Sequence, residues 1–236
     1  GQPGFIRVDT VHQGDKRDGS KGVYHINFVD EVTQWELMAC VQSISEAHLL
    51  TIFEIILEQF PFIIINFHAD NGSEFINKIV VKLLEKLRIK LTKSRPRQHN
   101  DNALVETKNG SVVRKHMGYL HIPKSFAEDI NQWYQEWFNI YLNYHRPCAY
   151  AKRIVDKKGK EKFIYPQGDY QIPFEKLKTL KDYQKYLKPG ITIVNLNKIA
   201  YALSDTDFAQ EMLNAKKVVF SKIYENIRNN TFTLFK

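Results

Sequence analysis

The chain has 236 residues, of which 43% are hydrophobic and 13% aromatic, so it can bury a substantial core. No apolar run reaches the length of a membrane span and no secretory signal opens the sequence, so we expect neither a membrane protein nor a secreted one. The two cysteines, Cys40 and Cys148, lie far apart and match no metal-ligand spacing, which favours a reducing, cytoplasmic setting. The formal net charge of +8 favours a polyanionic partner, although a lysine-rich surface also keeps a protein in solution.

The first ninety residues carry alternating strand and helix signals. Short β-branched and apolar runs predict strands, and apolar residues at helical spacing predict the helices between them. The continuous apolar run "FIIINF" is typical of a strand buried on both faces. The predicted elements are strands at 5–11, 22–30 and 34–41, a helix at 45–59, a strand at 62–67, a helix near 74–87 and a strand near 89–92. This order predicts a mixed sheet with helices against its faces.

The second half of the chain is helical at first and then changes in composition near residue 150. A basic loop at 93–99 precedes predicted helices at 102–117 and 125–143. A lysine-rich hairpin turning at Lys158-Gly159 follows, and Ser204 and Asp205 are candidates to cap a terminal helix. We therefore expect a core over residues 1–150 and a smaller, basic hairpin-plus-helix extension over 151–236.

Three carboxylates stand out by their positions. Asp9 lies on the first predicted strand, Asp70 follows the "FIIINF" strand, and Glu106 lies on the helix after the basic loop. If the two strands are parallel neighbours, both aspartates emerge at the carboxyl edge of the sheet, where ligands collect in α/β folds. Clustered carboxylates suit Mg²⁺ or Mn²⁺, and two such ions about 4 Å apart activate phosphodiester chemistry. The alternatives are a strand-turn-helix corner at Asp70 and a helix capped by asparagines at Glu106.

Four motifs in order strengthen the metal hypothesis: "VDTVH", "HADNGSEF", "SRPRQHNDNALVETKNGSVVRK" and "YHRP". Together they resemble the catalytic core of retroviral integrases and bacterial DDE transposases, above all insertion-sequence transposases. The resemblance covers about residues 1–150 and continues to about 180. It implies an α/β, ribonuclease-H-like fold with a mixed five-stranded sheet flanked by helices. It also implies that Asp9, Asp70 and Glu106 are catalytic and hold two Mg²⁺ ions, with Mn²⁺ as a substitute.

Several other side chains are candidates for contact with DNA. Asn102 and Asn109 share the helix face of Glu106 and could orient it or bind a phosphate, whereas Lys108 projects away. The alternative roles of Asn102 and Asn109 are helix capping and solvation. The alternative for the basic residues is a solvated, charged surface. Three histidines, His12, His68 and His99, lack the cysteine partners typical of zinc sites, and aromatic residues at 133–144 have the spacing of core packing. The residues expected at the DNA are Lys93, Arg95, Arg97, His99, Asn102, Asn109, Arg114 and Lys115.

These observations favour a transposase or integrase that cuts DNA ends with metal ions and joins them to target DNA. The partners would be transposon ends and target DNA in the bacterial cytosol, and pairing two ends implies a homo-oligomer. One alternative with the same fold is a nuclease that cuts without joining. Another is a domesticated DNA-binding protein that has the fold and no transposition activity.

Overall fold

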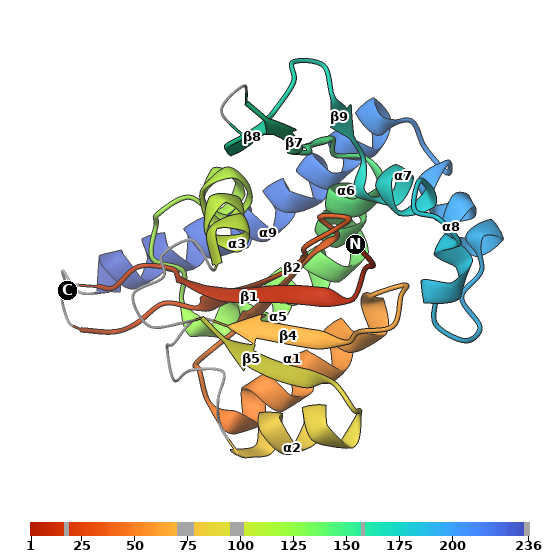
Figure 1. Cartoon of the computed structure of the whole chain (residues 1–236). Helices are drawn as coiled ribbons and strands as arrows, with labels where there is room; N and C mark the ends of the chain where they lie inside the picture. Colours follow the sequence, from red (N-terminus) through yellow and green to blue (C-terminus); the bar gives the residue numbers. More distant parts are fainter. Residues whose placement is uncertain (17–18, 70–77, 95–101, 157–158, 234–236) are drawn as a thin grey trace.

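A five-stranded mixed sheet forms the centre of the molecule (Figure 1). The computed structural model describes residues 1–16, 19–69, 78–94, 102–156 and 159–233. The strand order is β3-β2-β1-β4-β5, with antiparallel pairs β1–β2 and β2–β3 and parallel pairs β1–β4 and β4–β5. This is the predicted ribonuclease-H-like arrangement. The strands are β1 (Phe5–His12), β2 (Tyr24–Asp30), β3 (Glu36–Val41), β4 (Asn66–Ala69) and β5 (Lys90–Lys93).

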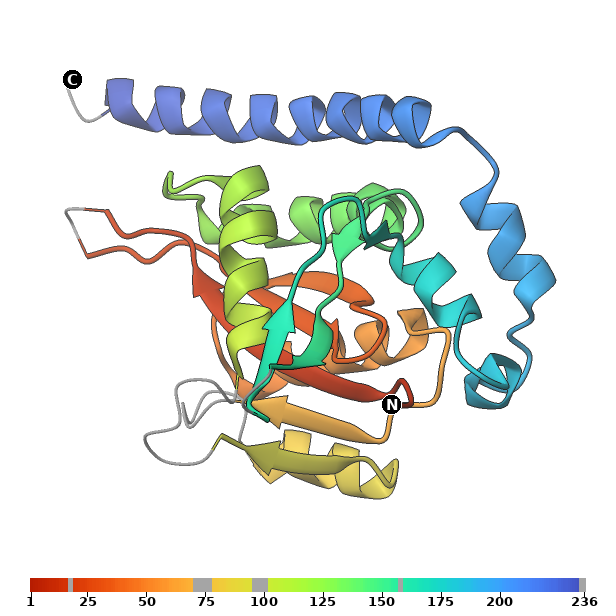
Figure 2. The same cartoon turned by 45° about the horizontal axis from the view of Figure 1, so that its top comes forward.

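Each face of the sheet is covered by a separate group of helices (Figures 1 and 2). Side chains alternate along the strands, so Leu37 and Ala39 enter the core beneath α1 and α2, while Met38 and Cys40 enter the core on the opposite face. The first core is covered by α1 (Glu46–Gln59) and α2 (Lys78–Lys86). The second is covered by two long helical segments, each interrupted by a π-helical stretch: α3 (Ala103–Lys108), η3 (Asn109–Arg114) and α4 (Lys115–Met117), then η4 (Lys124–Phe126), α5 (Ala127–Trp133), η5 (Tyr134–Phe138) and α6 (Asn139–Tyr144).

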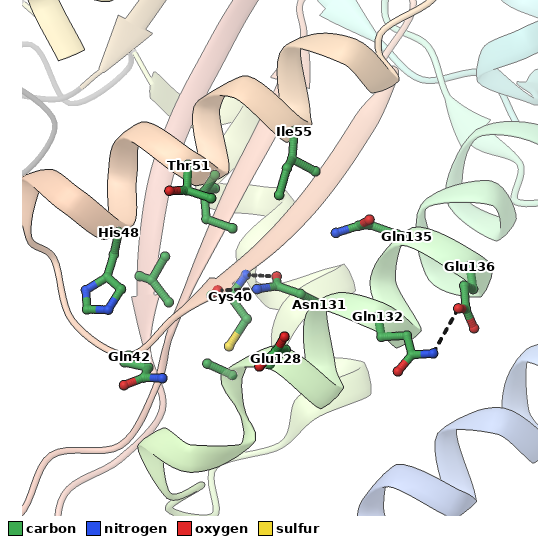
Figure 3. Close-up of a pocket in the computed structure, with 13 residues that line it drawn as sticks. Cys40, Gln42, His48, Thr51, Ile55, Glu128, Asn131, Gln132, Gln135 and Glu136 are labelled. Atoms are coloured by element: carbon green, nitrogen blue, oxygen red, sulfur yellow. Dashed lines mark hydrogen bonds between the residues drawn. The ribbon is translucent and has the colours of Figure 1, made fainter. Parts of the chain in front are cut away.

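The edge strand β3 is closed by asparagine side chains rather than by another strand. Asn131 accepts from the backbone N–H of Cys40 at 2.6 Å and donates to its carbonyl at 2.7 Å (Figure 3). Asn139 makes the same pair of bonds with Met38, and Asn143 with Glu36. A pocket of about 590 Å³ lies between α1 and α5 beside the Cys40 end. These amides satisfy backbone groups that would otherwise be open to another strand.

The π-helical stretch η5 explains how Asn131 and Asn139 reach the same strand. Eight residues of regular α-helix would turn the second asparagine about 80° away from the first. A π-bulge adds a residue to one turn and removes most of this offset. Sequence periodicity predicted one continuous helix here, and the interruption is a correction imposed by packing against β3.

The prediction of a strand at 62–67 is wrong for its first half. Pairing with β1 starts only at Asn66, because β1 begins at Phe5 and Gly4 accepts from both Ile65 and Asn66 N–H groups. Gly4 has φ +106°, and a Cβ there would lie 2.4 Å from the Ile63 carbonyl oxygen. Ahead of Asn66, Phe62 forms a β-bridge with Leu187 of the C-terminal extension, and the Ile63 N–H donates to the carbonyl of Tyr186 at 2.8 Å.

The extension packs against the core through both groups of helices. Phe174 and Leu177 join the first core, and Phe208 and Met212 join the second. β7 and β8 pair antiparallel as the two strands of the predicted lysine-rich hairpin, and part of its predicted turn lies outside the described residues. The terminal helix is capped by Ser204, whose Oγ accepts from the Asp207 N–H at 3.2 Å. The elements are β6 (Cys148–Ala149), β7 (Lys152–Val155), β8 (Glu161–Ile164), β9 (Tyr170–Gln171), α7 (Pro173–Lys178), η6 (Tyr183–Tyr186), α8 (Ile193–Ala200) and α9 (Asp205–Thr233). None of the described helices is both long and apolar enough to cross a lipid bilayer.

Candidate active site at the carboxyl edge of the sheet

Asp9 lies on the face of β1 that is turned toward α3. Its neighbour Val8 belongs to the core beneath α1, and successive side chains of a strand point to opposite faces. Val8 pairs with Ala69, the last residue of β4, so the two parallel strands reach this edge in register. Asp9 itself pairs with Asn27 of β2. The strands are therefore parallel neighbours, the condition on which the carboxylate hypothesis depends.

Two neutral donors hold the carboxylate of Asp9. Asn109 Nδ2 donates to Oδ2 at 2.6 Å, and the backbone N–H of Thr10 donates to Oδ1 at 2.8 Å. Asn27 Nδ2 in turn donates to Asn109 Oδ1 at 3.2 Å, which fixes the orientation of the Asn109 amide. These amides and the N–H group carry no net charge, so they orient the carboxylate without cancelling its charge.

Asn102 binds the backbone of the same strand. It occupies the N-cap position of α3, but its side chain makes no capping hydrogen bond. Instead its Nδ2 donates to the carbonyl of Val8 at 3.4 Å, and within the described residues its buried Oδ1 has no hydrogen-bond partner. The helix starts where the sequence predicts, and the alternative role of Asn102 as a side-chain cap is not the one it takes. The amide ties α3 to β1 instead.

Glu106 lies between these two contacts along α3. It follows Asn102 by four residues and precedes Asn109 by three, so the three side chains share one side of the helix. Both asparagines contact β1, and Glu106 is exposed on the same side. The fold therefore brings Glu106 to the strand that carries Asp9.

Several predicted site residues lie outside the described part of the chain. They are Asp70, Arg95, Arg97 and His99. Within the described ranges no three acidic, histidine or cysteine side chains gather closely enough to hold one metal ion. The three-carboxylate centre consequently stays a prediction.

The predicted cations differ in how available they are for DNA. Lys93, at the end of β5, and Lys115 are exposed. Arg114 is engaged within the protein, because its guanidinium donates to the carbonyls of His12 at 2.9 Å and Gly118 at 3.3 Å. Lys108 points away from Glu106, as its helical position predicts, and its Nζ lies 3.3 Å from Glu36 Oε2. Lys93 and Lys115 are the better candidates for phosphate contact.

The histidines near this edge contact neighbouring polar side chains. His12 Nε2 lies 3.3 Å from Asp15 Oδ1, and His68 contacts the hydroxyls of Thr92 at 2.9 Å and Ser94 at 3.2 Å. Both cysteines of the chain are buried and free of disulfides.

The donor set at this edge fits a hard divalent cation. Asp9 supplies carboxylate oxygens, and the buried, unpartnered amide oxygen of Asn102 lies beside the same strand. Oxygen ligands of this kind suit Mg²⁺ better than they suit softer metals. Of the three predicted ligands, Asp9 and Glu106 lie in the described part of the chain at this edge, and Asp70 lies outside it.

One contributor to the site was missed in the sequence. Asn27 lies within the buried strand β2, where its amide is fully covered and donates to Asn109. A polar amide in the middle of "YHINFVD" was a signal that this strand faces other polar groups, since buried amides are normally hydrogen-bonded.

Comparisons with known proteins give distant similarities. No protein-family model matches the chain. The uncharacterized protein y4rM of Sinorhizobium fredii is 33% identical over 118 residues, which cover 50% of this chain and 33% of that protein. The chain thus spans about a third of the length of this relative.

Two solved structures with similarity to this chain are integrase catalytic core domains. That of BIV integrase has a TM-score of 0.43 and 14% identity, over 61% of this chain and 85% of that one. That of HTLV-2 integrase, in complex with magnesium and in a dimeric form, has a TM-score of 0.43 and 17% identity, over 62% and 91%. The fold assignment for this chain rests on its own strand order and register.

Proposed function

We propose that the chain is the catalytic part of a DDE-type transposase or integrase. Its reaction would be metal-dependent cleavage of DNA ends, followed by strand transfer into target DNA. Asp9, Asp70 and Glu106 would be its catalytic residues and would hold two Mg²⁺ ions. The observation that carries the proposal is the convergence of β1, β4 and α3, with Asn102 and Asn109 tying the Glu106 helix to the Asp9 strand.

The chemistry needs only two in-line displacements at phosphorus. Water attacks the phosphodiester at the transposon end, a P–O bond forms, and the bond to the 3′ oxygen breaks to leave a free 3′-hydroxyl. That hydroxyl then attacks a target phosphodiester, and the target's own 3′ oxygen leaves. Bound Mg²⁺ would supply Lewis-acid stabilisation of the entering and leaving oxygens.

The protein's own residues would position the DNA and the ligands. Asn109 and the Thr10 N–H hold the Asp9 carboxylate in one orientation, and such outer contacts typically matter for metal affinity. Lys93 and Lys115 are exposed for contact with the phosphate backbone, which would make binding dependent on salt. Since transposition pairs two DNA ends, we propose a homo-oligomer on DNA.

The test is an assay with labelled transposon-end DNA and a target plasmid in Mg²⁺. Asp9→Asn and Glu106→Gln remove one charge each with little change of volume, so both should keep the fold and lose cleavage by at least about a thousandfold, the scale of losing an essential electrostatic group. Glu128→Gln, at an exposed acid on α5 outside this edge, is the matched control and should keep activity.

The products decide between the candidate activities. Joined products support a transposase, cut ends without joining indicate a nuclease, and bound but intact DNA indicates a protein without catalysis. Undiminished cleavage by Asp9→Asn would refute the assignment of the site.

A further inference from the structure

A pocket of about 460 Å³ lies between α3 and the base of the β7–β8 hairpin. One wall is the side of α3 turned away from Glu106, including Thr107 and Lys108. The opposite wall includes Tyr165 and Tyr170, whose side chains are 65% and 60% exposed. Figures 1 and 2 both show the hairpin beside α3.

Among the charged side chains at and beneath this pocket, positive charges outnumber negative ones. Lys108 is only 5% exposed, and its Nζ lies 3.3 Å from Glu36 Oε2. Arg146 NH1 lies 3.8 Å from the same oxygen, so two cations share one buried carboxylate. An excess of positive charge in a partly buried pocket favours an anionic ligand.

The hairpin itself, the ribbon formed by β7 and β8, is exposed on both faces. Across the ribbon, each charged residue faces an apolar or aromatic one, as in the pairs Arg153–Phe163 and Lys152–Ile164. Phe163 is 68% exposed and Val155 63%. An isolated two-stranded ribbon is marginally stable, so a partner that covers it would stabilise it.

The acidic residues near the ribbon do not cancel its affinity for phosphates. Asp169, Glu161 and Asp156 pair with Lys152, Arg153 and Lys162, but all three pairs are on the surface. Ion pairs between exposed side chains contribute little to stability, so phosphates can take the place of the acidic partners. Residues 151–166 hold six lysines and arginines against two acids, a net charge of +4.

We propose that the pocket and the ribbon together bind a single-stranded segment of DNA. Tyr165 and Tyr170 would stack on unpaired bases, while Lys152 and Lys162 contact phosphates. A positively charged groove with aromatic platforms is the common design of single-strand binding sites. The pocket admits a base but not a duplex, and a duplex keeps its base faces covered. The inference rests on the proposed function, because DNA whose ends are cut would supply such a strand.

The test measures fluorescence anisotropy of a labelled 15-nucleotide oligothymidylate, in EDTA so that no DNA is cut. The double variant Tyr165→Ala/Tyr170→Ala should bind about tenfold more weakly or worse, the typical effect of losing base stacking. Tyr165→Phe/Tyr170→Phe should bind like the wild type, because the rings remain. Tyr224→Ala, a change at an exposed tyrosine of α9, is the control.

A second variant tests the cations through salt. Lys152→Gln/Lys162→Gln should flatten the slope of log affinity against log salt by about 1.4, since each phosphate contact contributes about 0.7. Lys181→Gln/Lys198→Gln removes the same charge from exposed positions elsewhere and should leave the slope unchanged. A wild-type affinity for the oligonucleotide in the tyrosine-to-alanine variant would overturn the proposal. The proposal would also be overturned if this variant lost affinity for a 15-base-pair duplex by the same factor as for the oligonucleotide.

The two proposals fail separately. If Asp9→Asn abolishes cleavage while the tyrosine variant binds normally, only the single-strand site is refuted. If the tyrosine variant loses binding while Asp9→Asn cleaves normally, the single-strand site stands and the assignment of the catalytic residues falls.

Discussion

At the scale of single residues, two histidines are held neutral by the cores of the protein. Burial, with a smaller effect from Arg114, lowers the pKa of His25 from 6.5 to about 3. Burial and then Lys216, Lys115 and Arg146 lower the pKa of His116 to about 3 as well. His116 packs its ring against Phe138, with 4.6 Å between centroids. Both rings must be deprotonated for the protein to pack as it does.

These histidines should make the protein sensitive to acid. Their pKa values are lower in the folded state than the value near 6.5 of the unfolded chain, so below pH 6.5 the unfolded state binds more protons. The free energy of unfolding should then fall as the pH drops from 6.5 toward 3, by about 1.4 kcal/mol per pH unit for each histidine. Urea unfolding at pH 7.5, 6 and 5 measures this.

His116→Phe isolates the contribution of one ring. As the pH falls, the free energy of unfolding of this variant should decrease by about 1.4 kcal/mol less per pH unit than that of the wild type, because phenylalanine binds no proton. His48→Phe, at an exposed histidine on α1, is the control and should leave the slope of the wild type. Identical slopes for wild type and His116→Phe would show that this histidine titrates normally in the folded state.

At the scale of elements, the three asparagines on α5 and α6 complete the sheet at β3. Asn143 bonds both the N–H and the carbonyl of Glu36, each at 2.7 Å, in a fully buried position. Asn131 makes the corresponding bonds to Cys40 in a part-buried position. The asparagines of one helical face thereby form the hydrogen bonds that a sixth strand would form with β3. The edge of β3 is then not open to pairing with another chain.

Asn143→Ala should lower the free energy of unfolding by about 2–4 kcal/mol, because it leaves two buried backbone groups without partners. Asn131→Ala should lower the free energy of unfolding by less, because water can reach the backbone groups of Cys40 that lose their partner. Urea unfolding measures both, and hydrogen exchange should show faster exchange at the amide of Glu36 in the first variant. Equal costs for the two variants would contradict a burial-dependent role.

At the scale of the whole molecule, α9 crosses the outer side of the helices that cover the sheet (Figure 2). Phe208 is 8% exposed and stacks on His145, with 4.2 Å between ring centroids. Trp133 Nε1 donates to the carbonyl of Met212 at 3.2 Å. The last helix is therefore anchored near its start by apolar packing, and this packing continues to Ile223, which is fully buried in the same core.

Phe208→Ala should lower the free energy of unfolding by about 3–5 kcal/mol, the cost of deleting a buried aromatic side chain. The variant should also loosen the start of α9, since the Phe208 ring packs this end of the helix against the second core. Hydrogen exchange along α9, together with urea unfolding, measures both effects. Tyr224→Ala changes an exposed ring of the same helix and should cost under about 0.5 kcal/mol. If Phe208→Ala unfolds like the wild type, the anchoring role is wrong.

Much of the fold could be predicted because its signals are local. The order of the first seven elements, the two strands of the lysine-rich hairpin and the start of α9 at Ser204 depend on residues close together in the chain. The apolar run at 62–65 was misread because periodicity reports burial and does not reveal what covers a segment. Phe62 bridges Leu187 of the extension, more than a hundred residues away, and Ile63 is 50% exposed.

For the site, the sequence by itself determined which carboxylates and amides to consider and which of them share the side of a helix with Glu106. Only the tertiary structure decided that β1 and β4 are parallel and in register, that Asn102 binds Val8 instead of capping α3, and that Asn27 supports Asn109. The physical reason is that spacing along a chain fixes the direction of a side chain within its element, whereas hydrogen-bond partners are fixed by the packing of elements distant in sequence.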